Sequence, residues 1–527
     1  MSIAAARKQM TMMDVELSDL PLTTYVFEHA QRWPDQPALI DGLTGVAISY
    51  RELIGAVRRA AAGFAAHGVV KGDVVALCAP NRPEFVITYH AALAAGAVVT
   101  AASPMATCAE LAGQLRSSGA RWMVTTQELY EQKAADAAAA AQLREVFVFG
   151  AGTGATSFAA LLNEAPPVPT AEVRADDLGL LLYSSGTTGL PKAVMLSHRN
   201  LVASLCQTRL VQLVRPGDVL IAVLPLSHIY GMQVTLNLGL HEGATLITMP
   251  RFELETFLRV VQQYRVTRVD IVPPTVLALA KQPVVDHYDV ASLRVITSAA
   301  APLSGVLARA CADRLGCRVK QGYGMTELGG ATHMAPDTGR DDPESIGPAL
   351  PGVECRVVDC VTGARIGPGE LGELLIRTPA AMPGYLNNPA ATAATVEPDG
   401  WLHTGDLVVQ DDEGWFRVVD RRKEVIKYNA YQVAPAELEG VLLSHPAVAD
   451  AAVIASPDER SGEVPKAFVV LSSPASAEEL LKFVADRVAP YKKVRIVEFI
   501  DEIPKSPAGK ILRRVLAQRD RAVVAGT

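Results

Sequence analysis

Apolar residues recur along positions 51–318 in two alternating patterns, one typical of helices and one typical of buried strands. Positions 51–67 place apolar residues at i, i+3, i+4 and i+7 spacing and end at Gly68, so they predict an amphipathic helix with a glycine cap. Further helices are predicted at 82–95, 109–118 and 303–315. The intervening apolar runs predict strands at 73–77, 122–125, 145–149, 178–183, 219–224, 244–248, 269–272 and 293–297. Strands separated by helices in this way predict a doubly wound α/β body with largely parallel sheets.

The pattern changes near Pro351, where short strands alternate with glycine and proline turns. Strands expected at 353–359, 369–377 and 414–420 predict a β-rich subdomain of about residues 351–419. Beyond it, helices are expected at 436–443 and 477–487, strands at 451–455, 467–471 and 495–499, and a basic helix at the end. We therefore expect an α/β fold: a large N-terminal domain (1–419) of doubly wound mixed sheets with the β-rich subdomain, then a small α+β C-terminal domain (420–527).

Two other segments have unusual composition. The longest apolar run, 85–102, contains Tyr89 and His90 and predicts a buried helix that leads into a strand rather than a membrane span. The alanine-rich stretch 134–141 predicts an exposed helix of high intrinsic propensity. The first sixteen residues lack the apolar core of a signal peptide.

Composition and charge exclude several classes of protein. The 527 residues are 49% hydrophobic and 20% charged, which is typical of globular proteins and not of disordered chains. The formal net charge of −7 provides no general attraction for nucleic acid or anionic lipid. Seven scattered cysteines without CxxC spacing argue against a disulfide framework or a cysteine zinc site, and they favour a reducing, cytoplasmic compartment.

The segment with the most evident chemistry is 183–200, which reads YSSGTTGLPKAVMLSHRN. A predicted strand ends in a turn of short hydroxyl residues and glycines, followed by a lysine: Ser184, Ser185, Gly186, Thr187, Thr188, Gly189 and Lys192. Phosphate oxygens are bound by backbone N–H groups, small hydroxyls and a cation, and glycines allow the main chain to approach closely. The order of residues is not that of a Walker A loop, because Pro191 precedes the lysine. The segment therefore predicts a phosphate-binding loop of another type.

This loop resembles that of the adenylate-forming superfamily, which includes acyl- and aryl-CoA synthetases, luciferases and peptide-synthetase adenylation domains. Six more blocks follow in the order typical of that superfamily: 224–231 (LPLSHIYG), 321–327 (QGYGMTE), 372–377 (GELLIR), 401–406 (WLHTGD), 420–427 (DRRKEVIK) and 504–513 (PKSPAGKILR). The resemblance covers nearly the whole chain. Among the branches, the 4-coumarate–CoA ligase-like one is the most similar.

The resemblance implies a two-step reaction of a small-molecule carboxylic acid with ATP, Mg²⁺ and CoA. The carboxylate first attacks the α-phosphate to give acyl-AMP, and CoA then takes the acyl group. By this resemblance Lys510 is the adenylation lysine and Glu327 the Mg²⁺ ligand. Asp406 would bind the ribose, with Arg421 beside it. The implied nucleotide-binding residues further include Gln321, Gly322, Tyr323, Gly324 and Thr326.

The resemblance also implies a gate and a mobile C-terminal domain. His228 matches the aromatic gate between the ATP and acyl pockets, and Asp420 matches the hinge. Rotation about that hinge would withdraw Lys510 and bring Lys427 and Gln432 to the site for thioester formation.

The acyl pocket is predicted from small and apolar residues near the matched blocks. The candidates are Tyr230, Val234, Ser298, Ala299, Ala300, Gly330, Ala331 and Thr332. Their size and polarity favour an aryl, alicyclic or medium-chain acid. An aspartate that would bind an amino group, as in peptide-synthetase domains, is absent from 224–231.

Three alanines stand where the resemblance leads us to expect glycine: Ala193, Ala299 and Ala430. Asn429-Ala430 replaces a Lys-Gly pair in the loop that would line the pantetheine tunnel. If that backbone requires a positive φ, alanine costs roughly 1 kcal/mol and its methyl group narrows the tunnel. An alternative function is therefore an acyl-adenylating enzyme with weak or no CoA ligation that hands acyl-AMP to a partner enzyme or another acceptor. The sequence also leaves open whether the chain forms a homodimer.

Two other classes of protein share a feature with this chain. Gly150, Gly152 and Gly154 follow a predicted strand as in nicotinamide-dependent oxidoreductases, but the third glycine comes one residue too early for GxGxxG and prolines interrupt the unit. A noncatalytic nucleotide-binding or scaffold protein is the other rival. The retained Lys510, Glu327 and Asp406 argue against it.

Overall fold

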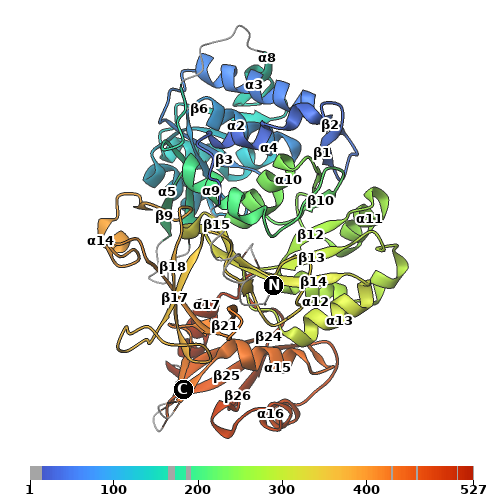
Figure 1. Ribbon diagram of the computed structural model, residues 1–527, viewed down its shortest axis with the longest axis vertical. Coiled ribbons are helices and arrows are strands. Elements are labelled where there is room, and N and C mark those ends of the chain that lie inside the picture. Colours follow the sequence, from blue (N-terminus) through green and yellow to red (C-terminus); the bar gives the residue numbers. More distant parts are fainter. Residues whose placement is uncertain are drawn as a thin grey trace, which may run out of the picture.

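The computed structural model describes residues 15–163, 172–184, 191–428, 431–458, 461–506 and 509–525. It confirms the predicted α/β class with a large N-terminal part and a small C-terminal one. We call the elements from α2 (Leu22–Phe27) to β21 (Trp415–Arg421) the N-terminal body and those from β22 (Ile426–Tyr428) to α17 (Arg513–Ala525) the C-terminal lobe. Figure 1 shows the lobe, orange to red, at the lower end of the molecule, below the larger body.

The first large sheet has eight strands in the order β15-β14-β13-β12-β10-β11-β1-β2. Its strands from β1 to β14 pair in parallel, whereas β2 and β15 add antiparallel edges. The bounds are β1 Pro37–Asp41, β2 Ala47–Ser49, β10 Val219–Ala222, β11 Thr245–Thr248, β12 Arg268–Ile271, β13 Val295–Ser298, β14 Arg318–Met325 and β15 Gly330–Met334. The mixed character of this sheet confirms the prediction.

The second large sheet also has eight strands, in the order β19-β9-β8-β4-β3-β5-β6-β7. The pairs from β8 to β7 are parallel, and β9 and β19 are antiparallel. The bounds are β3 Val74–Cys78, β4 Val98–Ala101, β5 Ala120–Thr126, β6 Glu145–Phe149, β7 Thr156–Ser157, β8 Leu178–Ser184, β9 Lys192–Ser197 and β19 Gly384–Tyr385.

Local signals set the helices that cover these sheets. Helix α3 (Tyr50–Ala66) begins with a capping box between Ser49 and Glu52, and α5 (Cys108–Ser118) ends at the left-handed Gly119. Helix α4 (Pro83–Ala94) contacts strands of both large sheets and is buried nearly all round, as its continuous apolar run predicted. Other helices of the body are α9 His198–Thr208, α11 Leu254–Tyr264, α12 Pro273–Lys281, α13 Gly305–Leu315 and α14 Pro389–Ala393.

The alanine-rich segment is helical as predicted, but only one of its faces is exposed: Ala139 and Ala140 are exposed, whereas the other face is buried. It forms η2 (Tyr130–Ala134) and α7 (Ala135–Ala140), and Ala134 and Ala137 are fully buried. They pack with Leu111 and Leu115 of α5 in one apolar cluster. Alanine side chains are short enough to let the two helices approach closely, which a propensity argument does not consider.

An antiparallel five-stranded sheet follows in the order β16-β21-β20-β18-β17. Its strands are β16 Gly347–Pro348, β17 Glu354–Val358, β18 Leu371–Arg377, β20 Leu402–Gln410 and β21 Trp415–Arg421. The sequence predicted β17, β18 and β21 but not β20, which contains the WLHTGD block. This sheet lies between the large sheets and the C-terminal lobe, where β17 and β18 are labelled in Figure 1.

The C-terminal lobe is a sheet in the order β23-β22-β25-β24, with β26 paired to β25 and three helices around it. Its elements are β22 Ile426–Tyr428, β23 Tyr431–Val433, α15 Pro435–Leu443, β24 Val448–Asp458, β25 Gly462–Leu471, α16 Ala477–Ala485, β26 Ile496–Phe499 and α17 Arg513–Ala525. Arg513 joins its parts: the guanidinium contacts Glu424 at 2.6 Å and Glu439 at 2.8 Å, and Nε donates to the Val453 carbonyl.

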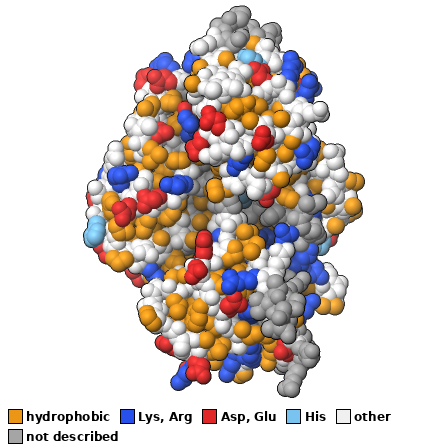
Figure 2. All heavy atoms as spheres, turned by 180° about the vertical axis from the view of Figure 1, so that it is seen from behind, with side chains coloured by type: hydrophobic (Ala, Val, Ile, Leu, Met, Phe, Trp, Pro, Cys, Tyr) orange, Lys and Arg blue, Asp and Glu red, His pale blue; other side chains and the backbone are white. Residues whose placement is uncertain are grey.

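The surface carries charges of both signs. On the face shown in Figure 2, Lys and Arg side chains are interspersed with Asp and Glu side chains over the described residues. Within the described ranges, no helix combines the length and hydropathy needed to cross a bilayer.

Candidate active site

A cavity of about 1200 Å³ lies where the two large sheets, the antiparallel sheet and the C-terminal lobe meet. Its walls come from the carboxyl ends of β8, β13 and β14, from β20 and β21, and from the lobe. Open α/β sheets usually bind ligands outside the carboxyl ends of their strands, and this cavity follows that rule.

One end of the cavity is lined by Tyr323 and Arg421, which hold the almost fully buried Asp406 carboxylate directly behind the lining. The hydroxyl of Tyr323 donates to Oδ2 at 2.6 Å, and Nε of Arg421 lies 3.0 Å from Oδ1. Burial raises the pKa of Asp406, and Arg421 opposes that effect. Burial raises the pKa of Tyr323 well above its usual value, so its hydroxyl stays a donor. The three groups form a fixed polar corner suited to sugar hydroxyls.

Strand pairing positions this corner. Asp406 is directly opposite Arg421 in the β20–β21 ladder. The preceding turn is anchored because Thr404 donates to the Leu374 carbonyl and the buried Glu373 accepts from the Gly405 N–H.

A second group of side chains suits phosphate and a cation. Oγ of Ser184, at the end of β8, is buried and has no hydrogen-bond partner among the described residues, although it lines the cavity. Such an orphaned hydroxyl is unusual in a folded protein and fits a site that a ligand completes. Lys192, which begins β9, lies with its ammonium 5.0 Å from the Tyr385 ring centre.

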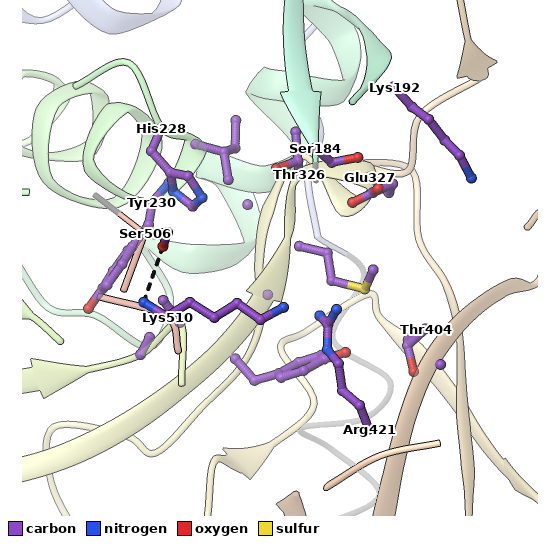
Figure 3. A pocket seen from close by; sticks show the side chains of 18 of the residues that line it. Ser184, Lys192, His228, Tyr230, Thr326, Glu327, Thr404, Arg421, Ser506 and Lys510 are labelled. Carbon is purple, nitrogen blue, oxygen red and sulfur yellow. Dashed lines mark hydrogen bonds between the residues drawn. The ribbon is translucent and has the colours of Figure 1, made fainter. Parts of the chain in front are cut away.

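Glu327 places its carboxylate oxygens in the same part of the cavity. It is buried in the short helix η5 (Thr326–Leu328), and the Tyr385 hydroxyl donates to its Oε1 at 3.0 Å, which leaves Oε2 without that donor. Thr326 lines the cavity beside it, and both are labelled in Figure 3. Hard divalent cations such as Mg²⁺ prefer a few carboxylate and hydroxyl oxygens together with substrate phosphates, and this donor set fits that preference.

Lys510 reaches the cavity from the C-terminal lobe. Its side chain extends between the side that carries His228 and Tyr230 and the side that carries Arg421 and Thr404 (Figure 3). The turn that carries it is closed by hydrogen bonds from the Lys510 N–H to Ser506 Oγ and from the Ser506 N–H to the Lys510 carbonyl. Burial lowers the pKa of Lys510, and the Arg421 charge lowers it further.

The lobe contacts the body directly around this lysine. A Cβ on Gly509, whose φ is +75°, would lie 3.0 Å from Cγ2 of Val272. Nζ of Lys281 donates to the Leu443 carbonyl at 2.9 Å. At the junction Asp420 accepts from the N–H groups of Arg421 and Ala436.

The opposite end of the cavity is apolar. His228 accepts from the Tyr230 N–H at Nδ1, and burial lowers its pKa, so the neutral ring keeps its proton on Nε2. The Tyr230 hydroxyl donates to the Thr297 carbonyl, which fixes the ring along the wall. The remaining predicted residues that line this end are Val234, Ala299, Ala300, Gly330 and Ala331. Ala300 has a φ of +72°, a left-handed conformation that costs a non-glycine residue roughly 1 kcal/mol.

Some predicted residues lie elsewhere or outside the described ranges. Ser298 and Thr332 are fully buried and do not line the cavity, and Gln321 instead holds the Leu303 and Pro343 carbonyls. Lys427 lines the cavity, and its backbone pairs with Gln432, whose side chain is not described. The predicted residues Ser185, Gly186, Thr187, Thr188 and Gly189, and also Asn429 and Ala430, lie outside the described residues.

The structure adds residues that sequence reasoning missed. Tyr385 donates to the predicted Glu327, Glu373 holds the Gly405 turn, and both line the cavity together with Met325 and Ser506. Tyr385 belongs to the two-residue strand β19, so its register against β9 could not be predicted from periodicity. Gly324 is required by packing, since a Cβ there would lie 2.0 Å from the Gly330 carbonyl oxygen.

Known proteins resemble this chain along its whole length. The family model of AMP-binding enzymes matches residues 26–386, and that of the AMP-binding enzyme C-terminal domain matches 437–510. The chain is 43% identical over 523 residues to a 4-coumarate–CoA ligase of Pinus taeda (96% of both chains). It is 41% identical over 514 residues to 4-coumarate–CoA ligase 1 of Petroselinum crispum (95% of this chain, 94% of the relative). The crystal structure of the anthranilate CoA ligase AuaEII with anthranoyl-AMP superposes with a TM-score of 0.91 at 25% identity, covering both chains fully.

Proposed function

The chain belongs to the family of AMP-binding enzymes, and on that premise we propose that it is an acid–thiol ligase that converts an organic carboxylic acid into its CoA thioester through acyl-AMP. The observation that carries this proposal is the meeting of Lys510, from the C-terminal lobe, with Tyr323 and Arg421, from the body, in one cavity, where both body residues also contact the buried Asp406. In this cavity a nucleotide bound by the N-terminal body would face the ammonium group of Lys510 from the C-terminal lobe.

In the first half-reaction a carboxylate oxygen attacks the α-phosphorus of ATP, and pyrophosphate leaves with the bridging oxygen. Two anions must approach each other, so the protein contributes positive charge and position rather than a nucleophile. We assign Lys510 to the carboxylate and α-phosphate, and Ser184 and Lys192 to the other phosphates. Asp406 would accept from the ribose hydroxyls, with Tyr323 against the base and Arg421 beside the ribose.

Mg²⁺ would be held by Glu327, with Thr326 near the phosphates, and when bound it neutralises phosphate charge. Tyr385 orients the Glu327 carboxylate by donating to one of its oxygens. The neutral ring of His228 lies between the polar and the apolar ends of the cavity and can separate the ATP pocket from the acyl pocket.

In the second half-reaction the CoA thiolate attacks the acyl carbonyl, a thioester bond forms and AMP leaves. We propose that a C-terminal domain of residues 420–527, which includes the lobe, turns about Asp420 and that Lys427 and Gln432 serve this step. The body would then be residues 1–419, with the β-rich subdomain near 351–419.

The apolar end of the cavity favours an aromatic acid. Its wall combines the aromatic Tyr230 with small residues, and among the described residues that line this end no carboxylate faces a substrate amino group. The relatives named 4-coumarate–CoA ligases point to the same class, so we expect hydroxycinnamic or related aryl acids to be preferred over medium-chain or alicyclic acids. The seven cysteines are all free, which suits a reducing, cytoplasmic compartment.

The proposal is tested by incubating the protein with ATP, Mg²⁺, CoA and a panel of aryl, alicyclic and fatty acids, with separation of products by HPLC. Formation of AMP and an acyl-CoA in equal amounts is expected. Pyrophosphate exchange that stays silent with every acid, although ATP binds, would overturn it in favour of a noncatalytic protein.

A second candidate function is the first half-reaction alone, in which acyl-AMP forms but is not transferred to CoA. It is favoured by Asn429-Ala430, where glycine was expected in the loop that would admit pantetheine. In the same experiment, acyl-AMP that accumulates in the presence of CoA, without acyl-CoA, would identify this second function.

A further inference from the structure

A cluster of histidine and glutamate side chains lies outside the cavity, where two short helices pack together. Helix α2 (Leu22–Phe27) is followed by Glu28 and His29, and helix α10 (Leu238–His241) ends with His241 and is followed by Glu242. The ring of Tyr25, in α2, stacks on that of His241 with centroids 4.3 Å apart and planes 9° from parallel. None of these residues lines the cavity of the candidate active site.

The His241 ring is arranged like that of a metal ligand. The residue is 1% exposed, and its Nδ1 lies 3.0 Å from the Tyr25 carbonyl oxygen. A carbonyl can only accept, so Nδ1 carries the proton and Nε2 presents its lone pair. Burial lowers the pKa of His241 to about 4, so the ring is neutral near pH 7. Histidines that bind metals usually donate their other ring N–H to a carbonyl or carboxylate in this way.

Nε2 of His241 is buried and has no hydrogen-bond partner among the described residues. A buried polar atom without a partner costs stability, so its presence calls for an unseen ligand. The groups that face the His241 ring include the potential metal ligands Glu28, His29 and Glu242, together with the guanidinium of Arg209, which is paired with Glu242. The nearest oxygens are Oε1 of Glu242 at 3.8 Å and Oε1 of Glu28 at 4.0 Å.

The third donor is His29, whose Nε2 lies 3.3 Å from Oε1 of Glu28. The donor atoms of Glu28, His29 and His241 all lie within 4.8 Å of one another. In a tetrahedral zinc site, bonds of about 2.0–2.2 Å place the ligand atoms about 3.4 Å apart. To reach that spacing, the half-buried His29 and the exposed Glu28 would have to move so that the longest of these separations shortens by up to about 1.4 Å.

We propose that Glu28, His29 and His241 bind one divalent transition-metal ion, with zinc as the best fit. Two imidazoles and one carboxylate suit zinc and its first-row neighbours, whereas Mg²⁺ and Ca²⁺ prefer oxygen ligands alone. Arg209 donates to Oε1 of Glu242 at 2.9 Å, so that carboxylate is already paired and water is the expected fourth ligand. The ion joins the segment after α2 to the end of α10, which gives it a structural role separate from the ATP site.

The test uses the full-length protein, freed of metal with a chelator and dialysed against increasing ZnCl₂, with bound metal measured by elemental analysis. One zinc ion per chain is expected. His29→Gln and Glu28→Gln should each weaken binding by more than about tenfold, and both lie at the surface, where substitution leaves the core intact. His287→Gln, at an exposed histidine outside the cluster, should leave the affinity unchanged.

Spectroscopy provides a second readout. Co²⁺ added in place of zinc should give the visible absorption of a four-coordinate site in the wild type and in His287→Gln, and lose it in His29→Gln. Equal zinc affinity of the wild type and His29→Gln, or no saturable zinc binding at all, would overturn the proposal. Both results are independent of whether the protein adenylates any acid.

Discussion

The phenolic hydroxyl of Tyr323 and Oδ2 of Asp406 are hydrogen-bonded at 2.6 Å although 83 residues separate them in the sequence. The bond joins β14 of the first large sheet to β20 of the antiparallel sheet. It therefore fixes the position of the carboxylate that we propose for ribose binding relative to the wall that we propose for the nucleotide base.

Tyr323→Phe should weaken ATP binding while it preserves the aromatic ring. A hydrogen bond to a buried carboxylate contributes about 1.5 kcal/mol or more, which corresponds to roughly a tenfold higher KM for ATP with kcat little changed. Steady-state kinetics against ATP and against Mg²⁺ measure the effect. Tyr385→Phe is the matched control, since its hydroxyl contacts Glu327 instead and should alter the Mg²⁺ dependence. Identical profiles for the two variants would contradict the separate roles.

Lys510→Ala should reduce acyl-AMP formation by about a hundredfold or more, because the cation that stabilises the reacting oxygens is removed. Conversion of chemically prepared acyl-AMP and CoA to the thioester should remain largely intact. Lys482→Ala, at an exposed lysine of α16, serves as the control and should affect neither step. Equal loss of both steps in Lys510→Ala would refute the assignment.

Gly509→Ala should impair adenylation by disturbing how the lobe docks on the body. The added methyl group would lie 3.0 Å from Val272 Cγ2, and the positive φ adds roughly 1 kcal/mol of strain. Thioester formation from supplied acyl-AMP should change much less. Gly363→Ala introduces the same strain at φ +70° without any neighbour within 4 Å, so it separates the clash from the backbone effect. Similar activities of the two variants would mean that the contact has no role in docking.

Asp420→Asn should change how stability depends on pH. Burial raises the pKa of Asp420 to about 6, whereas the unfolded chain releases the same proton near 3.8. Between pH 3.8 and pH 6 the folded state keeps this proton, whereas the unfolded state has released it. The free energy of unfolding of the wild type therefore falls as pH rises from about 4 through 6. Asparagine has no such proton, so the variant should gain up to about 3 kcal/mol relative to the wild type between pH 4 and pH 7. Urea unfolding of both proteins across this range measures the difference in their free energies of unfolding. A difference that is the same at every pH would contradict the prediction.

Ala430→Gly should accelerate thioester formation if the pantetheine tunnel is narrowed by the alanine, as the sequence suggests. Single-turnover reactions that start from acyl-AMP and CoA measure the step directly, and the rate of acyl-AMP formation is the internal control. An unchanged thioester rate would remove the argument for the second candidate function.

Much of the fold was predictable because its signals are local. The helix that ends at Gly119 and the apolar run of α4 both follow from residue pattern alone. Strand β20 was missed because Gly405, with φ +71°, and a register shift after Leu407 interrupt the period-two pattern. The strained Ala300 was also beyond sequence reasoning, which treated Ala299 as the unusual position.

The residues of the candidate site likewise fall into those that the sequence predicts and those that it does not. Lys510, Asp406 and Glu327 could be predicted because each lies in a distinctive block, and the structure brings all three regions to one cavity or its wall. The supporting residues could not, since Tyr385 and Glu373 act through contacts between strands that are far apart in the sequence. Ser298 and Thr332 show the opposite error: adjacency to lining residues does not place a side chain in the cavity when strands alternate their faces.

The contacts of Arg513 have a consequence for timing. This one guanidinium connects the segment that leads into β22, which bears Lys427, with the start of α17, three residues after Lys510. Both lysines therefore belong to one ion-paired unit. In the rotation about Asp420 that we propose, this unit would move both lysines at once, so that a single rotation separates acyl-AMP formation from its reaction with the thiol.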